Sequence, residues 1–507
     1  ARLLRKARKY DSAVRGLERA LAFHPENHQL VSCAMELVLE LKERHRAANI
    51  FTKYLEANLE ARRDDRLQAE QTLAGCDSVV EEGDQQTSES AMELIREASS
   101  LIENADLDKA REVVLNALHA HPTQPQAYLL YGDYHLRIKD FAAAARGYFA
   151  ALSFDPENEA ARRGLLDASR MHDKRDLPVR GEPEFSVLLA TYNRADCLRK
   201  CLAGCCVQTF SPERFEIVIV DDGSEDGTPA VVKSFEPYLN IRYLHQAHAG
   251  LAAARTLLTQ NARSALLGFF DDDDIVAPTC VEEHWKAHQQ YPDENVAVLG
   301  YSEWCPSLNV TPLMHYVTHV GKHYVDYTSL THGQFYDFRC FWGGRSSCKK
   351  ELLDGRELYD PEFTFTQDIE LAYRLSRRRP FRVLYHESAV HRFLEPMDLD
   401  RFLRRTVGKG RAARLFLDKH PDPALHSYLP VEDALSKWAN LEPICDKLVE
   451  LAHKLEEVVG KKRPASMEAE ECKELFVVYS QLYQAAWLKG VLAGQKEKRE
   501  PAIRNAR

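Results

Sequence analysis

Phe269-Phe-Asp-Asp-Asp-Asp-Ile-Val-Ala-Pro278 is the stretch around which the rest of the chain is organised. The residues from Leu266 to Phe270 are apolar enough for a buried strand, and four consecutive carboxylates follow where that strand would end. Adjacent negative charges repel one another, so a fold that gathers them at a strand tip normally supplies a cation. Hard divalent ions such as Mg²⁺ and Mn²⁺ prefer carboxylate oxygens and keep coordination positions open for phosphates. A solvated acidic turn is the alternative, but the hydrophobic strand before the run favours a metal.

Length and composition narrow the class of protein. A chain of 507 residues exceeds what one core usually serves, so about two to four domains are expected. The net charge of -10 argues against a nucleic-acid-binding protein, whose footprint is basic. No stretch of about 18 uninterrupted apolar residues occurs, so we expect no membrane span. The chain starts at Ala1 inside a helical pattern without a signal peptide, which predicts a cytoplasmic protein and leaves open a missing native N-terminus.

The 12 cysteines are scattered along the chain, as expected for reduced thiols in a cytoplasmic protein. Their nearest approach to a cluster has helical spacing and contains no paired Cys-x-x-Cys, so it does not predict a zinc site. This group consists of Cys197, Cys201, Cys205 and Cys206.

The N-terminal third has an internal period of about 34 residues. The clearest copy runs from Pro125 to Asn158 and the one before it from Ala91 to Gln124. Alanines fall where two helices would cross, aromatic residues fill the gaps and proline ends the second helix. The pattern resembles the tetratricopeptide (TPR) family, which implies an all-α solenoid over residues 1–177 with an irregular insertion at 62–90. Such an array presents a groove to a peptide or protein, although a rigid spacer or a surface for self-association remains open.

From Phe185 onward the pattern changes to alternating strands and helices. We expect strands at 186–191, 216–220 and 241–244, a helix at 251–262, and then the strand that carries the aspartates. This alternation predicts a parallel sheet with helices on both faces. Functional loops of such sheets lie at the carboxyl ends of the strands. Thr191, Asp222 and the run from Asp271 to Asp274 should therefore meet at one edge.

The ligand at that edge is narrowed by motifs that the sequence lacks. Neither Gly-x-Gly-x-x-Gly after the first strand nor Gly-x-x-x-x-Gly-Lys-Ser/Thr is present, which argues against a Rossmann dinucleotide site and a P-loop. A carboxylate after the second strand can accept hydrogen bonds from a base or a ribose hydroxyl. A metal at the aspartates would neutralise a diphosphate. Together they predict a site for a nucleotide diphosphate.

Four motifs, in order, resemble those of the family 2 glycosyltransferases of GT-A fold. They are Phe185-Ser-Val-Leu-Leu-Ala-Thr-Tyr-Asn-Arg194, Val218-Ile-Val-Asp-Asp-Gly-Ser224, Gly250-Leu-Ala-Ala-Ala-Arg255 and Phe270-Asp-Asp-Asp-Asp274. The resemblance covers roughly Phe185 to Phe393. It implies an α/β GT-A domain, the Rossmann-like nucleotide-diphospho-sugar transferase fold, at residues 184–398. A helical region at 399–507 follows it.

The resemblance also implies a reaction and its residues. The reaction is an inverting transfer of a sugar from a nucleotide sugar, expected to be a UDP-sugar, with Asp222 holding the base and Asp273 as the direct Mn²⁺ or Mg²⁺ ligand of the DxD pair. The implied donor-binding residues are Thr191, Asn193, Arg194, Asp222, Arg255, Asp271 and Asp272, and the implied metal ligands are Asp271, Asp273 and His391.

Two later motifs extend the likeness to the acceptor side. Phe341-Trp-Gly-Gly-Arg345 resembles the family's acceptor loop and implies Trp342, Gly343 and Gly344 as acceptor residues. Phe363-Thr-Phe-Thr-Gln-Asp-Ile-Glu-Leu-Ala-Tyr-Arg374 resembles the Glu-Asp motif that carries the catalytic base; the usual Glu is replaced by Gln367, and the Asp is present as Asp368. Inversion needs one such base to take the acceptor's proton, while a metal acts as Lewis acid on the phosphates.

Each of these residues also has a structural interpretation. Asp368 could cap a helix, Trp342 could pack rather than stack on a sugar, and His391 could be a core histidine. The basic run from Arg401 to Arg411 is a solvated helix face by default, or a lid that brings Lys409 or Arg411 over the diphosphate.

The sequence therefore predicts a metal-dependent inverting glycosyltransferase that modifies an acceptor hydroxyl, with the repeats docking a protein acceptor. A saccharide or lipid-linked acceptor in polysaccharide biosynthesis is the alternative within the enzyme class. A catalytically weak TPR scaffold is the alternative outside it.

Overall fold

The computed structural model describes residues 82–171, 182–353, 358–429, 431, 433–462 and 470–504. The part of the predicted solenoid before residue 62, and the predicted insertion up to residue 81, lie outside these ranges. Residues 87–432 and 455–507 form one compact unit, which holds all of the sheet, whereas residues 433–454 belong to another. The latter contain α18 (Ala434–Leu441) and the start of α19 (Cys445–Lys462).

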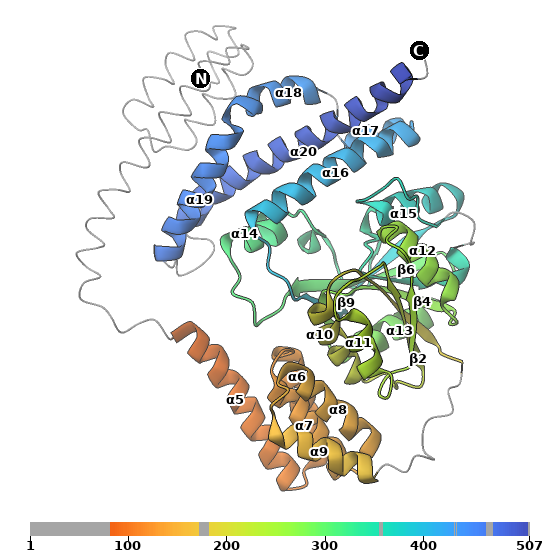
Figure 1. Cartoon of the computed structure of the whole chain (residues 1–507), viewed down its shortest axis with the longest axis vertical. Coiled ribbons are helices and arrows are strands. Elements are labelled where there is room, and N and C mark those ends of the chain that lie inside the picture. The colour runs from red at the N-terminus through yellow and green to blue at the C-terminus, as the bar shows by residue number, and fades with distance from the viewer. Residues whose placement is uncertain are drawn as a thin grey trace, which may run out of the picture. The chain divides into compact units, whose positions relative to one another are not determined.

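The described N-terminal part of the chain is helical (Figure 1). Its helices are α5 (Glu82–Glu103), α6 (Leu107–Ala120), α7 (Pro125–Arg137), α8 (Phe141–Phe154) and α9 (Glu159–Met171). Small residues permit their close packing: a Cβ added at Gly132 would lie 2.6 Å from the ring of Tyr148. Because Glu and Gln are good helix formers, α5 begins at Glu82, within the segment that was predicted to be irregular up to residue 90. The resemblance to tetratricopeptide repeats stays a prediction.

One mixed β-sheet forms the centre of the larger unit. Its strands are β1 (Phe185–Thr191), β2 (Phe215–Asp221), β3 (Ile241–His245), β4 (Leu266–Asp271), β5 (Asp274–Val276), β6 (Val296–Trp304), β7 (Phe335–Tyr336), β8 (Arg345–Lys349) and β9 (Arg382–Phe393). They are ordered β3-β2-β1-β4-β8-β6-β9-β5, and β7 pairs with β9. The predicted strands are confirmed, and β1 to β4 are parallel as expected. The prediction of a wholly parallel sheet is wrong, because β8 enters from a loop at the carboxyl end of β4 and runs antiparallel to it.

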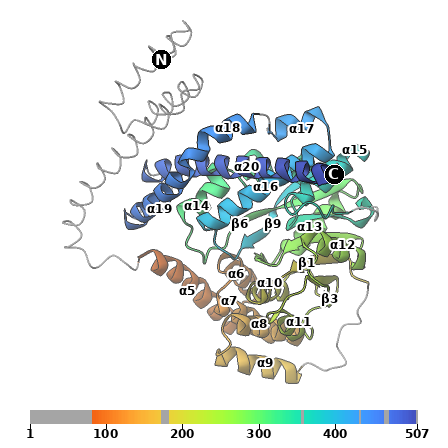
Figure 2. The same cartoon turned by 45° about the horizontal axis from the view of Figure 1, so that its top comes forward.

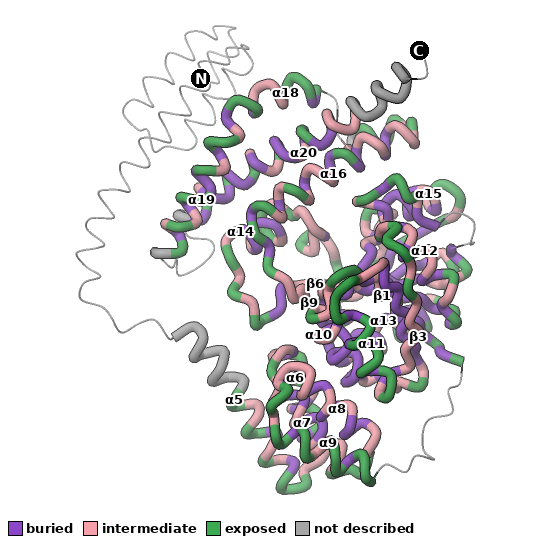
Figure 3. The backbone as a smooth tube through the Cα atoms, viewed as in Figure 1, coloured by how far each residue is buried: buried purple, intermediate pink, exposed green. Residues whose placement is uncertain are grey.

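Helices cover both faces of this sheet (Figures 1 and 2). One face packs against α10 (Ala195–Cys206), α11 (Thr228–Phe235) and α13 (Cys280–Gln290), and the other against α12 (Leu251–Asn261) and α15 (Gln367–Arg378). The central strands are therefore almost continuously buried, as Figure 3 shows. The N-terminal helices extend the first face: Phe149 of α8 stacks on Tyr238 with ring centroids 4.2 Å apart.

Further helices follow β9 or lie in the loop after β6. They are α14 (Pro312–His315), α16 (Leu399–Lys419), α17 (Pro423–Tyr428) and α20 (Glu470–Arg504). Short 3₁₀ or π-helical turns lie at Tyr316–Val320, Tyr327–Ser329, Phe338–Cys340, Lys350–Leu352 and Glu442–Ile444. The Asp398 carboxylate caps α16 by accepting a hydrogen bond from the Arg401 N–H at 2.7 Å. This helix lies along α20, where a Cβ at Gly410 would overlap the carbonyl of Trp487. None of the described helices is both long and apolar enough to cross a membrane.

Candidate active site

The strand register brings the predicted site residues to one edge of the sheet. Thr191 is paired with Asp221, and Ala190 with Asp271, so β1, β2 and β4 end at the same level. A cleft of about 430 Å³ opens there. Its walls include Thr191, Arg194, Asp222, Arg255, Asp271, Asp272, Asp273, Trp342, Gly343 and Asp368. Asp368 and the aspartate run thus line the same cleft.

The four aspartates differ in how far the cleft reaches them. The side chains of Asp271 and Asp273 are 32% and 19% exposed, whereas those of Asp272 and Asp274 are 6% and 1% exposed. This alternation arises because β4 ends at Asp271 and β5 begins at Asp274, with a tight turn between them. Asp271 and Asp273 are therefore the pair that a ligand in the cleft can reach.

Arginines hold this turn in place. The Arg194 guanidinium lies 3.1 Å from Asp272 and 2.8 Å from Asp273. On the other side, the buried Arg345 guanidinium lies 3.2 Å from Asp271 and 3.4 Å from Asp274. These contacts balance part of the charge that four adjacent carboxylates concentrate.

Burial still disfavours the charged carboxylates. It raises the pKa of Asp272 to about 7, together with the neighbouring charge of Asp273 and against the effect of Arg194. Burial likewise raises the pKa of Asp271 and, well above its usual range, that of Asp274. One oxygen each of Asp272 and Asp274 is buried and lacks a hydrogen-bond partner among the described residues. Carboxylate oxygens suit a hard divalent cation such as Mn²⁺ or Mg²⁺, and Asp271 and Asp273 are the two whose side chains the cleft reaches.

Asp222 lines the cleft but already has a full set of hydrogen bonds. One carboxylate oxygen accepts from Gln246 Nε2 at 2.6 Å and the Ala249 N–H at 2.8 Å. The other accepts from the Gly250 N–H at 2.8 Å and lies 2.9 Å from His248 Nδ1. In the structure Asp222 therefore positions the loop at 246–250. A base that bonded to it directly would replace a side chain of this loop.

Asp368 and the acceptor loop contact each other directly. Asp368 Oδ2 accepts a hydrogen bond from the Gly343 N–H at 2.7 Å, and Oδ1 accepts one from the Ile369 N–H at 2.9 Å. Thr366, the residue before α15, has a positive φ of 57°, a conformation that threonine rarely adopts. This kink brings the first turn of α15, and with it Asp368, to the cleft.

The two glycines of the acceptor loop allow close approach to charged groups. A Cβ at Gly343 would contact the Arg255 guanidinium, and one at Gly344 would overlap the Asp271 carboxylate. Gly344 also has a φ of +104°, which favours glycine. The Arg255 guanidinium lies 3.5 Å from Asp271.

Trp342 lines the cleft at half burial, and its Nε1–H donates to the Arg339 carbonyl at 3.1 Å. Its ring lies edge-on to Tyr324, with centroids 6.4 Å apart. The Lys409 ammonium lies 5.8 Å from the Trp342 ring centre and 5.6 Å from that of Tyr324. Trp342 is thus held by packing while its surface faces the cleft, which combines the two interpretations of the sequence.

Helix α16 contributes cationic side chains whose role the sequence left open. Arg401, Arg405 and Lys409 recur every four residues, so they share one face, and all three line the cleft. Arg411, the alternative to Lys409 in the predicted lid, is exposed and does not line it. Burial, with the nearby charge of Arg405, lowers the pKa of Lys409 to about 7. Because this spacing is also typical of a solvated helix face, only the packing of α16 shows that these three residues line the cleft.

Three predicted site residues, Asn193, Gly344 and His391, do not line the cleft. Asn193 joins two turns: its N–H donates to Ser224 Oγ, and its Oδ1 accepts from the Glu225 N–H. Gly344 acts through its backbone approach to Asp271.

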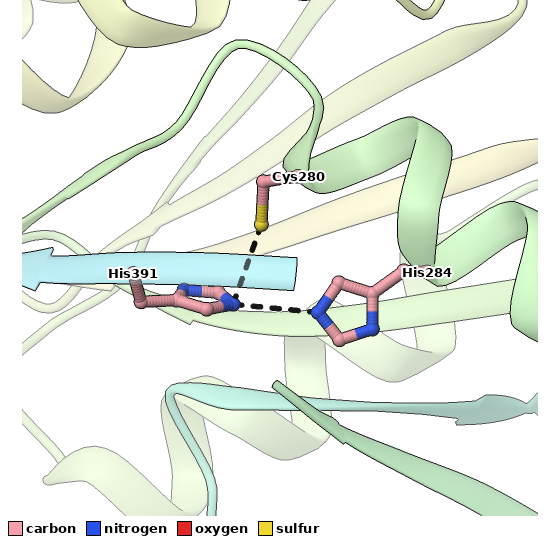
Figure 4. A group of neighbouring side chains, drawn as sticks. All are labelled: Cys280, His284 and His391. Carbon is pink, nitrogen blue, oxygen red and sulfur yellow. Dashed lines mark hydrogen bonds between the residues drawn. The ribbon is translucent and has the colours of Figure 1, made fainter. Parts of the chain in front are cut away.

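His391 is fully buried and does not line the cleft. Its Nε2 lies 3.3 Å from His284 Nε2 and 3.5 Å from Cys280 Sγ, as Figure 4 shows. The structure therefore does not bring it to Asp271 and Asp273.

Comparison with known proteins gives the domain a family. Residues 186–354 match the family model described as Glycosyl transferase family 2. Validoxylamine A glucosyltransferase of Streptomyces hygroscopicus subsp. limoneus is 37% identical over 135 residues, which are 26% of this chain and 30% of the relative. Chondroitin synthase of Pasteurella multocida (strain Pm70) is 26% identical over 289 residues, 51% of this chain and 29% of the synthase.

Among solved structures, a mannosyltransferase from Pyrobaculum calidifontis in complex with GDP-Man and Mn²⁺ is 17% identical, and the match covers 69% of this chain and 98% of that one. Its TM-score is 0.40. The match to the two curated relatives spans less than a third of their length. Residues 186–354 therefore match a glycosyltransferase family 2 domain, and the two curated relatives are named as a glucosyltransferase and a chondroitin synthase. Asp368, His391 and α16 lie beyond the matched residues.

Proposed function

We propose that this chain is a metal-dependent inverting glycosyltransferase, which transfers a sugar from a UDP-sugar to an acceptor hydroxyl. The observation that carries the proposal is that the aspartate turn, Asp368 and the acceptor loop line one cleft. The cleft volume lies within the range of pockets that hold small ligands.

The charges of the cleft suit a diphosphate accompanied by a divalent cation. Among the described residues that line it, the acidic ones are Asp222, Asp271, Asp272, Asp273, Asp368 and Glu395, and the Arg and Lys ones are Arg194, Arg255, Arg345, Arg401, Arg405 and Lys409. The charges of these acidic and basic side chains nearly cancel. The charges of a diphosphate and a divalent cation also nearly cancel, so binding both together leaves the net charge of the cleft almost unchanged. Arginine forks match phosphate oxygens in geometry as well as in charge.

Asp271 and Asp273 would hold the cation, because their carboxylates are the ones that the cleft reaches. When bound, the metal withdraws electron density from the departing diphosphate. The arginines around the turn stabilise the negative charge that the leaving group gains as its bond to the sugar breaks.

Asp368 is the proposed base. Its carboxylate accepts hydrogen bonds from the Gly343 and Ile369 N–H groups, which orient it. The acceptor oxygen forms a bond to the anomeric carbon as the bond from that carbon to the diphosphate oxygen breaks. The acceptor proton passes to Asp368. Attack opposite the leaving group inverts the configuration.

The nucleobase would lie beside Tyr192 and His248. These rings are stacked with centroids 4.3 Å apart, both line the cleft, and Asp222 fixes His248. Such an aromatic pair offers the base a stacking surface.

Two acceptor classes remain in the proposal. A protein docked by the N-terminal helices is the first. A saccharide is the second, and Trp342 favours it, because an indole that lines the acceptor side can stack on a sugar ring. Offering a labelled donor with proteins and with oligosaccharides separates them: the class that accepts label identifies the acceptor.

Thermal unfolding with a panel of nucleotide sugars, with and without Mn²⁺, tests the donor proposal. A bound donor stabilises the folded state by mass action, so the UDP-sugars should raise the melting temperature more with Mn²⁺ than without it. Asp273→Asn should remove the Mn²⁺-dependent part. Asp337→Asn, which alters an exposed ion pair with Arg339, should retain it. The donor proposal fails if no nucleotide sugar stabilises the protein.

A further inference from the structure

A second cluster of ligating atoms lies behind the sheet edge, apart from the cleft. Cys280 and His284 project from α13 and His391 from β9, and all three are fully buried. Figure 4 shows the thiol and the two Nε2 atoms converging. One ligand atom from each residue lies within 4.8 Å of the other two.

Two of the three separations match the edges of a metal tetrahedron. Zinc bonds of about 2.05 Å to nitrogen and about 2.3 Å to sulfur place two nitrogens about 3.3 Å apart and a nitrogen and a sulfur about 3.6 Å apart. The observed separations are 3.3 Å between the two Nε2 atoms and 3.5 Å between His391 Nε2 and Cys280 Sγ. We propose that Cys280, His284 and His391 bind one Zn²⁺ ion or a similar transition-metal ion, leaving the fourth position to a small ligand such as water.

The neighbouring hydrogen bonds decide which ring nitrogens of this cluster carry protons. Lys349 Nζ lies 3.2 Å from His288 Nδ1 and donates to it, so the His288 Nε2–H donates to Ser347 Oγ at 2.9 Å. If the Ser347 hydroxyl in turn donates to His284 Nδ1 at 2.8 Å, the His284 Nε2–H points at His391 Nε2. That nitrogen has one lone pair, which also faces the Cys280 thiol. His391 Nδ1 has no hydrogen-bond partner among the described residues.

A cation can take the place of the proton between the two Nε2 atoms. Both Nε2 lone pairs and a Cys280 thiolate would coordinate it, and the His284 Nδ1–H would donate to Ser347 Oγ. Ligating histidines commonly donate their second N–H to such a partner. Burial lowers the pKa of His284 to about 3 and that of His391 well below its usual value, so both imidazoles are neutral, as metal binding requires.

The chemistry separates this site from the aspartate turn. Thiolate and imidazole favour Zn²⁺ and its neighbours, whereas the carboxylates favour Mn²⁺ or Mg²⁺. The ion would connect α13 to β9. His391 is paired with Val276, and Phe393 with Asp274. The ion would therefore also hold β5, the strand that follows the aspartate turn. Its role would be structural, and it does not depend on the proposed transfer reaction.

Metal analysis of the full chain tests the site. After loading with Zn²⁺ and dialysis against a weak chelator, the wild type should retain about one equivalent that Cys280→Ser and His284→Gln lose. Cys348→Ser is the matched control, because Cys348 is buried in the core on the opposite face of the sheet. It should retain the ion, as should Asp273→Asn. Loss of the ion in Asp273→Asn, or equal retention in Cys280→Ser and Cys348→Ser, would overturn the proposal.

Cobalt substitution in the wild type covers the case in which the Cys280 variant does not fold. Co²⁺ bound by this cluster should show the intense visible absorption of a tetrahedral site and a thiolate-to-cobalt charge-transfer band. A wild-type protein that binds no Co²⁺ with thiolate ligation contradicts the inference.

Discussion

Burial and the neighbouring charge of Asp273 disfavour the ionised form of Asp272 in the aspartate turn. Its folded-state pKa of about 7 lies above the ordinary value of 3.8, so the native state binds more protons than the unfolded state between these values. The metal-free protein should therefore lose stability as pH rises from about 4 to about 7. Mn²⁺ should stabilise it more at pH 8 than at pH 6. Thermal unfolding across this pH range, with and without Mn²⁺, checks both.

The control for this prediction is Asp272→Asn, which removes the titrating group. It should stabilise the metal-free protein near pH 8 and flatten its pH profile between pH 4 and 7. An unchanged profile would show that another group is responsible.

Gly344 permits the acceptor loop to lie against Asp271. Gly344→Ala combines a positive φ with a Cβ that would overlap the carboxylate, so the loop must move. Gly333 has a φ of +77° but open space around its Cβ position, which makes Gly333→Ala the matched control for backbone strain. The control should cost about 1–2 kcal/mol of folding free energy and leave donor affinity unchanged.

Gly344→Ala should destabilise the protein more than Gly333→Ala and also weaken donor binding. Urea unfolding and titration with a UDP-sugar measure the two effects. Equal losses in both variants would mean that the contact with Asp271 is unimportant.

At the scale of elements, α16 lies outside the residues that the family model matches and forms one wall of the cleft. Arg405 lines the cleft, and its neighbour Arg404 is exposed. If Arg405 pairs with the diphosphate, Arg405→Gln should weaken donor binding roughly 10- to 100-fold, the range expected for a lost hydrogen bond to a charged group. Arg404→Gln should bind like the wild type. Calorimetric titration distinguishes them, and similar affinities would remove α16 from the donor site.

The strand tips were predictable because local patterns determine them. An apolar run before Asp271 and another before Asp222 specify strands, and parallel strands place their carboxyl ends together. The role of α16 could not be predicted, because the spacing of Arg401, Arg405 and Lys409 defines a helix face but does not specify what that face packs against. That depends on the crossing with α20, where Gly410 approaches Trp487.

The position of His391 was also beyond sequence reasoning. The pairing of β9 with β6 shifts register between Gly300 and Tyr301, so Val390 follows His386 along the ladder. A bulge of this kind changes which face of the sheet the later residues occupy. His391 consequently meets Cys280 and His284 instead of the aspartates.

At the scale of the molecule, the N-terminal helices are part of the core that supports the sheet. Phe149 of α8 contacts Tyr238 and, edge-on at 4.9 Å, Phe235 of α11. Phe149→Ala should cost about 2 kcal/mol, less than a fully buried phenylalanine, because this ring is half-buried. Leu166→Ala on α9, where the residue is 57% exposed, is the control and should change stability little. Equal denaturation midpoints would argue against a shared core.

The central claim is that Asp368 acts as the base opposite the aspartate turn. The most direct measurement is the steady-state rate of UDP release from a UDP-sugar with Mn²⁺, with water as acceptor, together with donor affinity by calorimetry. Asp368→Asn should slow release roughly 10²–10⁴-fold while donor affinity stays close to the wild type. Glu362→Gln, an exposed carboxylate of the same loop that does not line the cleft, should react normally. Undiminished release by a folded Asp368→Asn protein would contradict the account.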